Sequence, residues 1–290
     1  MHAPLDRRSF LLGSAAVVGT AALGFQSRAE DKDKDPFGGF TVAVQSYTFR
    51  AFKLERMLKA TQDVGIKNAE MYPGHIPANS SPDAIKGYLK LCGEYGVTPV
   101  SFGVVGFSKD TDKNKKLFEF GAALGVKSLS ADPDPDSFDS LDKLVAEYKI
   151  AVAIHPHGPS GGGKMHRWRD AASILKTIKD HHELIGTCLD TGHLIRAAQL
   201  DIKLDPVEQI KIMGARNFGL HLKDHDNKRM TDVPFGDKTG VLDVLGVLKE
   251  LKDVKFKGYI AIEYEASEKD PTADVKTCVA YFKEQVKKLG

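Results

Sequence analysis

Residues 185–193 read IGTCLDTGH, an apolar, strand-like run that ends abruptly in polar residues. The run 185–189 has the length of a buried strand, and Asp190 and His193 follow it directly. In parallel α/β proteins the carboxyl ends of the strands form the face that carries the active site. We therefore expect Asp190 and His193 to face a site at the end of a buried strand.

The same pattern recurs in three other segments of the chain. The polar clusters are His155-Pro156-His157 after the apolar run 150–154, His221-Leu222-Lys223-Asp224-His225 after 218–220, and Glu263-Tyr264-Glu265 after 259–262. Imidazoles and carboxylates thus follow four apolar runs. This recurrence indicates one divalent metal ion at the open end of a parallel barrel.

Strand-like and helical patterns alternate along the chain. The expected strands are 41–46, 68–71, 98–104, 128–131, 150–154, 185–189, 218–220 and 259–262, and the expected helices are 54–64, 82–95, 114–124, 137–148, 168–181, 206–213, 241–251 and 272–289. Eight strand–helix units predict a (β/α)8 TIM barrel, which needs about 250 residues. No glycine-rich phosphate fingerprint follows the first strand, which disfavours a dinucleotide-binding sheet.

The composition fits one domain with a small-molecule ligand. The 290 residues are 42% apolar, enough for an ordinary core. The 41 basic and 39 acidic residues give a net charge of +2, so no strong field attracts nucleic acid or anionic lipid. We expect no nucleic-acid partner, and a homodimer is compatible with the sequence.

The amino-terminal segment has the layout of an export signal. Arg7-Arg8 precedes the apolar, small-residue stretch 13–25, and Ser27-Arg28-Ala29 offers a cleavage site. The stretch is short for a bilayer span of about 20 apolar residues, so we expect no stable membrane insertion after the signal is removed. We predict a twin-arginine signal at 1–29, a charged linker at 30–38, a barrel at 39–290, and a periplasmic or otherwise exported protein.

The cysteines do not suggest a disulfide framework. Cys92, Cys188 and Cys278 are odd in number and lie inside expected helices or strands. We interpret them as buried free thiols. Because Cys188 precedes Asp190 by two positions on a strand, a metal-ligand role for Cys188 is the alternative.

The mixed cluster of nitrogen and oxygen donors predicts the type of ion. His155, Asp190, His221 and Glu263 together suit Mn, Zn, Co or Fe, with Mg as a further candidate. Such an ion leaves positions for substrate oxygens and stabilises an enediolate. Taken singly, a strand-end histidine is more often a loop residue, and Asp190 could be a helix N-cap instead. It is the combination that favours a metal site.

Several of these motifs together resemble a known family. They are 44–50 (VQSYTFR), 69–72 (AEMY), 190–193 (DTGH), 221–224 (HLKD) and 262–263 (IE). From about residue 40 to 290 the chain resembles the sugar phosphate isomerase/epimerase family, whose fold is the xylose isomerase-like TIM barrel of the AP endonuclease 2-like superfamily. That superfamily also holds ketose 3-epimerases, inosose dehydratase and endonuclease IV.

The resemblance implies roles for individual residues. It implies metal ligands at Asp190, His221 and Glu263, with His193 beside the substrate and Lys223 near the ligand's polar groups. Glu263 would also be the base that moves the proton. These motifs are specific for the superfamily but not for one substrate.

One position departs from the family pattern. Ketose 3-epimerases carry a glutamate at the end of strand five, where this chain has His155, with His157 two residues on. The scheme in which two glutamates serve opposite faces of a sugar is then incomplete. Glu70, at the end of the second expected strand, is a candidate replacement acid/base or substrate-hydroxyl anchor; the alternative is a structural ion pair.

Three functions follow from this sequence. The first is a metal-dependent isomerase or epimerase that removes a proton next to the carbonyl of a sugar or keto-sugar. The second is a lyase or dehydratase in which His157 or His193 protonates the leaving oxygen, and the third is a non-catalytic sugar or metal binder. Five aromatic residues near strand ends could form a sugar-binding wall or belong to the core: Tyr47, Phe49, Tyr72, Phe102 and Phe107.

Overall fold

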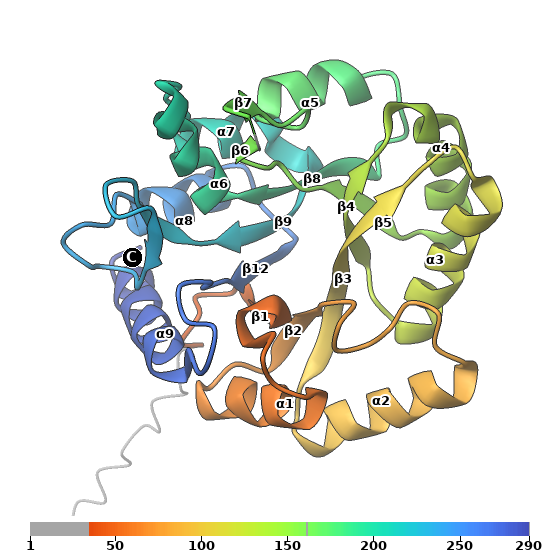
Figure 1. Cartoon of the computed structure of the whole chain (residues 1–290), viewed down its shortest axis with the longest axis horizontal. Helices are drawn as coiled ribbons and strands as arrows, with labels where there is room; N and C mark the ends of the chain where they lie inside the picture. Colours follow the sequence, from red (N-terminus) through yellow and green to blue (C-terminus); the bar gives the residue numbers. More distant parts are fainter. Residues whose placement is uncertain (1–34, 161, 290) are drawn as a thin grey trace, which may run out of the picture. The chain divides into compact units, whose positions relative to one another are not determined.

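Eight parallel strands close into a barrel in the computed structural model, which describes residues 35–160 and 162–289 (Figure 1). The strands are β1 (Thr41–Gln45), β2 (Asn68–Met71), β3 (Thr98–Phe107), β4 (Ser128–Pro133), β5 (Ala151–Ile154), β8 (Ile185–Asp190), β9 (Asn217–Leu222) and β12 (Tyr259–Ile262). The barrel closes because β1 pairs with both β2 and β12. The predicted (β/α)8 TIM barrel is confirmed, and each of the eight expected strands overlaps an observed one.

Helices surround this barrel (Figure 1). They are α1 (Leu54–Asp63), α2 (Pro82–Glu94), α3 (Thr111–Leu124), α4 (Phe138–Tyr148), α5 (Ala171–Ile178), α6 (Thr191–Arg196), α7 (Pro206–Met213), α8 (Val244–Asp253) and α9 (Thr272–Lys287). Two expected helices, 168–181 and 241–251, begin three residues too early. Asp170 and Asp243 cap α5 and α8 by accepting backbone N–H groups of the first turn, and a capping residue precedes the helix.

Alternation along the strands separates two kinds of side chain. In β12, Ile260 and Ile262 belong to the large apolar core, whereas Tyr259 and Ala261 belong to a small cluster inside the barrel. Successive side chains of a strand point to opposite faces, so Glu263 shares the inward direction of Ala261. Small inward residues therefore leave room for polar side chains at the carboxyl end of the barrel.

Two short hairpins extend the loops at this end. One joins β6 (Pro159–Ser160) to β7 (Lys164–Met165), and the other joins β10 (Asp224–Asp226) to β11 (Thr231–Val233). A 3-10 helix, Ser46–Phe49, follows β1. These segments supply side chains around the mouth of the barrel.

Some predictions fall outside the described residues. These are the twin-arginine signal (1–29) and the first part of the linker (30–38). Residues 35–290 form a compact unit of their own. Among the described helices, none is both long and apolar enough to span a bilayer. Cys92, Cys188 and Cys278 are free and buried, as predicted.

The core makes a prediction about stability. Ile260 is fully buried between the barrel and its helices, whereas Ile202 is 38% exposed. Ile260→Ala should lower the free energy of unfolding by about 2–5 kcal/mol, because it removes buried methyl groups and leaves a cavity. The same substitution at Ile202 should change it by less than about 0.5 kcal/mol. Urea unfolding measures both, and equal losses in the two variants would contradict this packing.

Candidate active site

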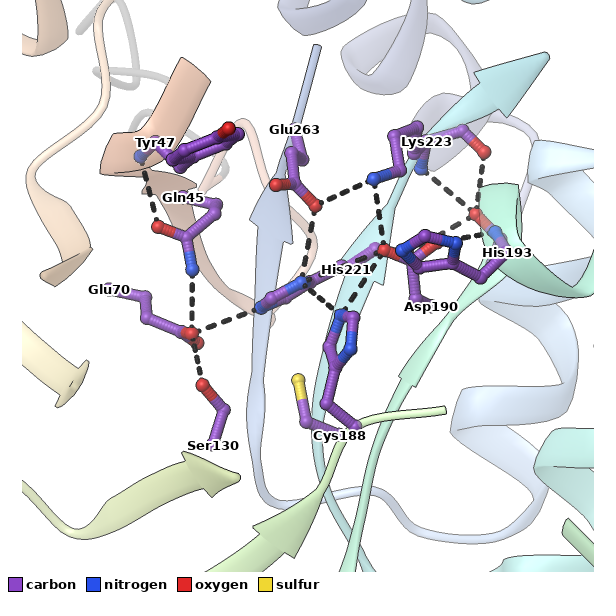
Figure 2. A network of polar contacts seen from close by, with 12 residues as sticks. Gln45, Tyr47, Glu70, Ser130, Cys188, Asp190, His193, His221, Lys223 and Glu263 are labelled. Carbon is purple, nitrogen blue, oxygen red and sulfur yellow. Dashed lines mark hydrogen bonds and ion pairs between the residues drawn. The ribbon is translucent and has the colours of Figure 1, made fainter. Parts of the chain in front are cut away.

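Side chains from the ends of four neighbouring strands lie close together at the carboxyl end of the barrel, and Figure 2 shows three of them, Asp190, His221 and Glu263. The strand register places Asp190 beside His221 and His221 beside Ala261. Nε2 of His155 lies 3.0 Å from Nδ1 of His221 and 3.4 Å from Oδ2 of Asp190. Nδ1 of His221 lies 3.7 Å from the same Asp190 oxygen and 3.2 Å from Oε2 of Glu263. The structure thus brings together the four side chains that the sequence suggested as ligands.

These spacings fit the shell of a small divalent ion. Ligand atoms about 2.1 Å from a tetrahedral ion lie about 3.4 Å from one another. Asp190 also carries the cap predicted as its alternative role, since Oδ1 accepts the N–H of His193 at 2.7 Å and begins α6. Its other oxygen, Oδ2, is buried without an aligned hydrogen bond. Asp190 therefore holds a helix with one oxygen, and the second one faces Lys223 and two imidazoles.

The charge of the cluster also favours a cation. The carboxylates of Glu70, Asp190 and Glu263 are buried, and that of Glu265 is partly buried. One ammonium group faces three of them, whereas Glu70 faces His221. Nζ of Lys223 lies 3.1 Å from Asp190, 3.1 Å from Glu263 and 2.5 Å from Glu265. Since buried charges require partners, a cluster with four carboxylates and one lysine attracts further positive charge.

The charges of neighbouring side chains set the protonation states of Lys223 and Glu263. Burial alone would lower the pKa of Lys223, but the carboxylates of Asp190, Glu263 and Glu265 raise it well above its usual range. Burial alone would raise the pKa of Glu263, but Lys223 and His221 lower it to about 2. Glu263 is therefore ionised and Lys223 protonated at neutral pH.

Glu70 lies beneath the cluster and supports His221. Its Oε1 lies 3.1 Å from Nε2 of His221 and accepts a hydrogen bond from Gln45 at 2.6 Å. Ser130 and Tyr259 donate their hydroxyl groups to the same carboxylate. Burial alone would raise the pKa of Glu70, and the adjacent His221 reverses this shift. Glu70 is fully buried and does not line the pocket, so its position favours the predicted ion pair over contact with a substrate.

The cluster forms the floor of a cavity of about 260 Å³. Its lining consists of Gln45, Tyr47, Tyr72, Gly103, Val104, His155, His157, His193, His221, Lys223, Glu263 and Glu265. The rings of Tyr47 and Tyr72 meet edge to face, with centroids 5.0 Å apart. Phe49, Phe102 and Phe107 are instead buried in the core. Of the five aromatic residues considered, the two tyrosines form the wall.

Two further imidazoles, His157 and His193, line the cavity next to His155. His157 and His193 each have a buried Nδ1 without a hydrogen-bond partner. Burial lowers the pKa of His193 well below its ordinary value. Burial, with a contribution from His155, lowers the pKa of His157 to about 3. Neutral imidazole offers one donor and one acceptor, so both rings can hydrogen-bond substrate hydroxyl groups.

The sequence assigned no role to three residues that contact the cluster across the barrel. These are Gln45, Ser130 and Tyr259. Their strand positions were predicted, but cross-barrel contacts have no local sequence signal. Cys188 lies near the cluster, with Sγ 3.4 Å from the Tyr259 hydroxyl. Burial raises the pKa of the Cys188 thiol, which disfavours the thiolate that a metal ligand requires.

A second large cavity, of about 340 Å³, lies at the amino ends of the strands. It contains Lys127, Lys255 and Lys257 but neither histidine nor carboxylate. In TIM barrels the amino-terminal face contributes to stability and the carboxyl-terminal face carries the chemistry. The smaller cavity is therefore the candidate active site.

The comparisons with known proteins agree with this architecture. The family model described as xylose isomerase-like TIM barrel matches residues 58–285. No curated protein matches the chain in sequence.

Similar solved structures cover most of the chain. An uncharacterized protein from Parabacteroides distasonis is 25% identical, with a TM-score of 0.62, over 84% of this chain and 97% of that one. The 3-keto-D-glucoside 4-epimerase of E. coli is 15% identical, with a TM-score of 0.64, over 84% and 99%. A protein described as the probable 3-DHS dehydratase of Bacillus anthracis is 11% identical, with a TM-score of 0.64, over 83% and 97%. These similarities establish the fold.

The buried imidazole of His157 predicts a pH dependence of stability. Its folded-state pKa of about 3 lies below the ordinary value of 6.5, so the unfolded chain takes up the proton more readily between these values. The stability present above pH 6.5 is lost as the pH falls through this window, by up to about 1.4 kcal/mol per unit.

The substitution His157→Asn should flatten the slope of unfolding free energy between pH 6.5 and 4.5. The measurement uses urea unfolding of chelator-treated protein at several pH values. An unchanged slope in the variant would show that His157 takes up its proton equally well in the folded state.

Proposed function

The chain belongs to the family of xylose isomerase-like TIM barrels, and from this premise we propose that it is a metal-dependent isomerase or epimerase of a sugar or keto-sugar. The observation that carries the proposal is the cluster of His155, Asp190 and His221 in the candidate active site, with Glu263 beside His221. The reaction is removal of a proton next to a carbonyl and its return at another face or atom.

A divalent ion of the Mn, Zn, Co or Fe type fits these four donors. Their mixture of imidazole and carboxylate matches the preferences of such ions. When bound, the ion would polarise the substrate oxygens and lower the energy of the charge that develops on them.

The side chains of this protein supply the proton transfer and the positioning. Glu263 is ionised and lines the cavity, so its carboxylate can take the proton from carbon. The ammonium of Lys223 lies beside it and offers positive charge to a substrate oxygen. Tyr47 and Tyr72 supply an apolar wall for the sugar ring, which limits the access of water.

The lining favours an unphosphorylated carbohydrate. Its one lysine, Lys223, already contacts three carboxylates, and no arginine lines this cavity among the described residues. A phosphate group would meet more negative than positive charge there. Export, which we propose from the sequence of residues 1–29, would also expose the protein to unphosphorylated sugars.

Elimination is the second candidate reaction. The carboxylates of the lining are Glu263 and Glu265, whereas His157 and His193, which lie next to His155, add only imidazoles. Because these histidines supply no carboxylate base, proton removal at one face followed by loss of a β-oxygen is chemically simpler than transfer between two faces. The similarity to a dehydratase shows that the same fold occurs in such a protein.

The proposed ion site predicts the effect of a single substitution. Asp190→Asn should lower the bound transition metal by one equivalent per chain, because the buried Oδ2 charge is lost. Asp180→Asn is the matched control, since the Asp180 side chain is 83% exposed. Elemental analysis of both purified variants gives the stoichiometry. Equal metal content in the Asp190 variant and wild type would reject the site.

The proposed reaction predicts solvent exchange. Incubation with keto-sugars in deuterated water should place deuterium at the carbon next to the carbonyl, and Glu263→Gln should slow this exchange by about 10²–10⁴-fold. Glu268→Gln, an exposed position on the following loop, should leave the rate unchanged. Mass spectrometry and NMR follow the label.

The products separate the candidate functions. A labelled epimer or isomer supports the first proposal, and a labelled product that has lost water or an alcohol supports the lyase. Saturable sugar binding with no exchange in any keto-sugar of the panel would reject both reactions and favour a binding protein.

A further inference from the structure

A second cluster of ligand-type side chains lies beside the candidate active site. Asp132 on β4, His157 after β5 and His166 after β7 each offer one donor atom, and the three atoms lie within 4.8 Å of one another. We propose that these three residues bind a second divalent cation, of the Zn²⁺ type, separate from the ion of the first four donors.

The local hydrogen bonds leave the required atoms free. Nδ1 of His166 accepts the backbone N–H of Trp168 at 3.2 Å, so Nε2 remains available, 3.5 Å from Oδ2 of Asp132. Oδ1 of Asp132 accepts from Arg167 at 2.8 and 3.2 Å, which leaves Oδ2 for a metal ion. Hydrogen bonds of this kind orient ligands in established metal sites.

His157 completes the set from the inner side. Its ring centroid lies 4.8 Å from that of His166, and its Nδ1 is buried without a partner. The backbone N–H of His157 donates to the carbonyl of Trp168 at 2.9 Å, which fixes the two loops against each other. An unpartnered buried nitrogen that faces a second imidazole and a carboxylate is explained by a shared ligand.

The charge near the cluster is compatible with a cation. Arg167 pairs with Asp132 and, at 2.9 Å, with Asp134. The two carboxylates of Asp132 and Asp134 thus face one guanidinium, which leaves one negative charge uncompensated. Oδ2 of Asp132 faces His166 and can carry this charge. A divalent ion bound by two neutral imidazoles and this carboxylate would compensate it.

The three donor atoms must move closer together to bind one ion. A spread of up to 4.8 Å exceeds the roughly 3.4 Å of a completed tetrahedral shell. The side chains of Asp132 and His166 are 30% and 22% exposed, so they can rotate without disturbing the core. Three protein ligands leave a fourth position for water or a substrate oxygen, as in catalytic zinc sites.

The position of His157 connects this cluster to the cavity. His157 lines the 260 Å³ cavity, whereas Asp132 and His166 lie outside its lining. The rings of His155 and His157 have centroids 4.7 Å apart, so each imidazole would serve a different ion. The open position of the second ion would then lie at the wall of the candidate active site, where it could hold a substrate oxygen.

Metal stoichiometry tests the second site independently of activity. The full chain is stripped with a chelator, reloaded with Zn²⁺, freed of excess ion and measured by elemental analysis. Wild type should hold two equivalents, His166→Ala and Asp132→Asn one each, and the double variant Asp190→Asn/His166→Ala none. His182→Ala, which removes an imidazole outside both clusters, should retain two equivalents.

This experiment tests the two proposed sites independently. Equal zinc content in wild type, His166→Ala and Asp132→Asn would overturn the second site, whatever Asp190→Asn does. Equal content in wild type and Asp190→Asn would reject the first site alone. Titration with Co²⁺ gives a second readout, since the visible absorption should build up in two steps in wild type and in one step in folded His166→Ala.

Discussion

The carboxylate of Asp190 is the interaction on which the rest of the site depends. One oxygen caps α6, and the other faces His155, His221 and Lys223. The cap fixes the side chain, because moving the second oxygen would also remove an acceptor from the first turn of the helix. A structural hydrogen bond thereby holds a buried negative charge at a fixed place, and the neighbouring strands provide the groups that compensate it.

This arrangement places several charges where water cannot reach them. Glu70, Asp190, His221 and Lys223 are almost fully buried. Buried ion pairs seldom stabilise a fold more than well-packed apolar residues would, but removing one partner leaves an uncompensated charge. The layer of Gln45, Ser130 and Tyr259 beneath His221 therefore serves orientation more than stability. The apolar contacts between the outward face of the barrel and its helices stabilise the fold.

The sequence predicted the architecture because the two signals, an apolar run and the polar residues after it, are local in the chain. An apolar run followed by a polar pair identifies a strand and its carboxyl end, and closure of the barrel brings four such ends together. The contacts of Tyr259 with Glu70 and of Arg167 with Asp132 join residues 189 and 35 positions apart. No pattern along the chain marks such pairs. The short helix α6 was not predicted as a separate element, because Asp190 and His193 were interpreted by their chemistry. The sequence did suggest Asp190 as the N-cap of a helix.

The histidine at position 155 changes the chemistry of the site as well as its ligands. A glutamate there would add a further carboxylate near the three that share Lys223, whereas histidine adds a nitrogen donor and no negative charge. The ring of His157 lies close by, with centroids 4.7 Å apart, and burial lowers the pKa of His157 to about 3. The consequence is an asymmetric cavity, with an ionised carboxylate at Glu263 and neutral hydrogen-bonding rings at His157 and His193. Such a cavity can remove a proton from one face of a substrate, while the other face meets groups that bind oxygen.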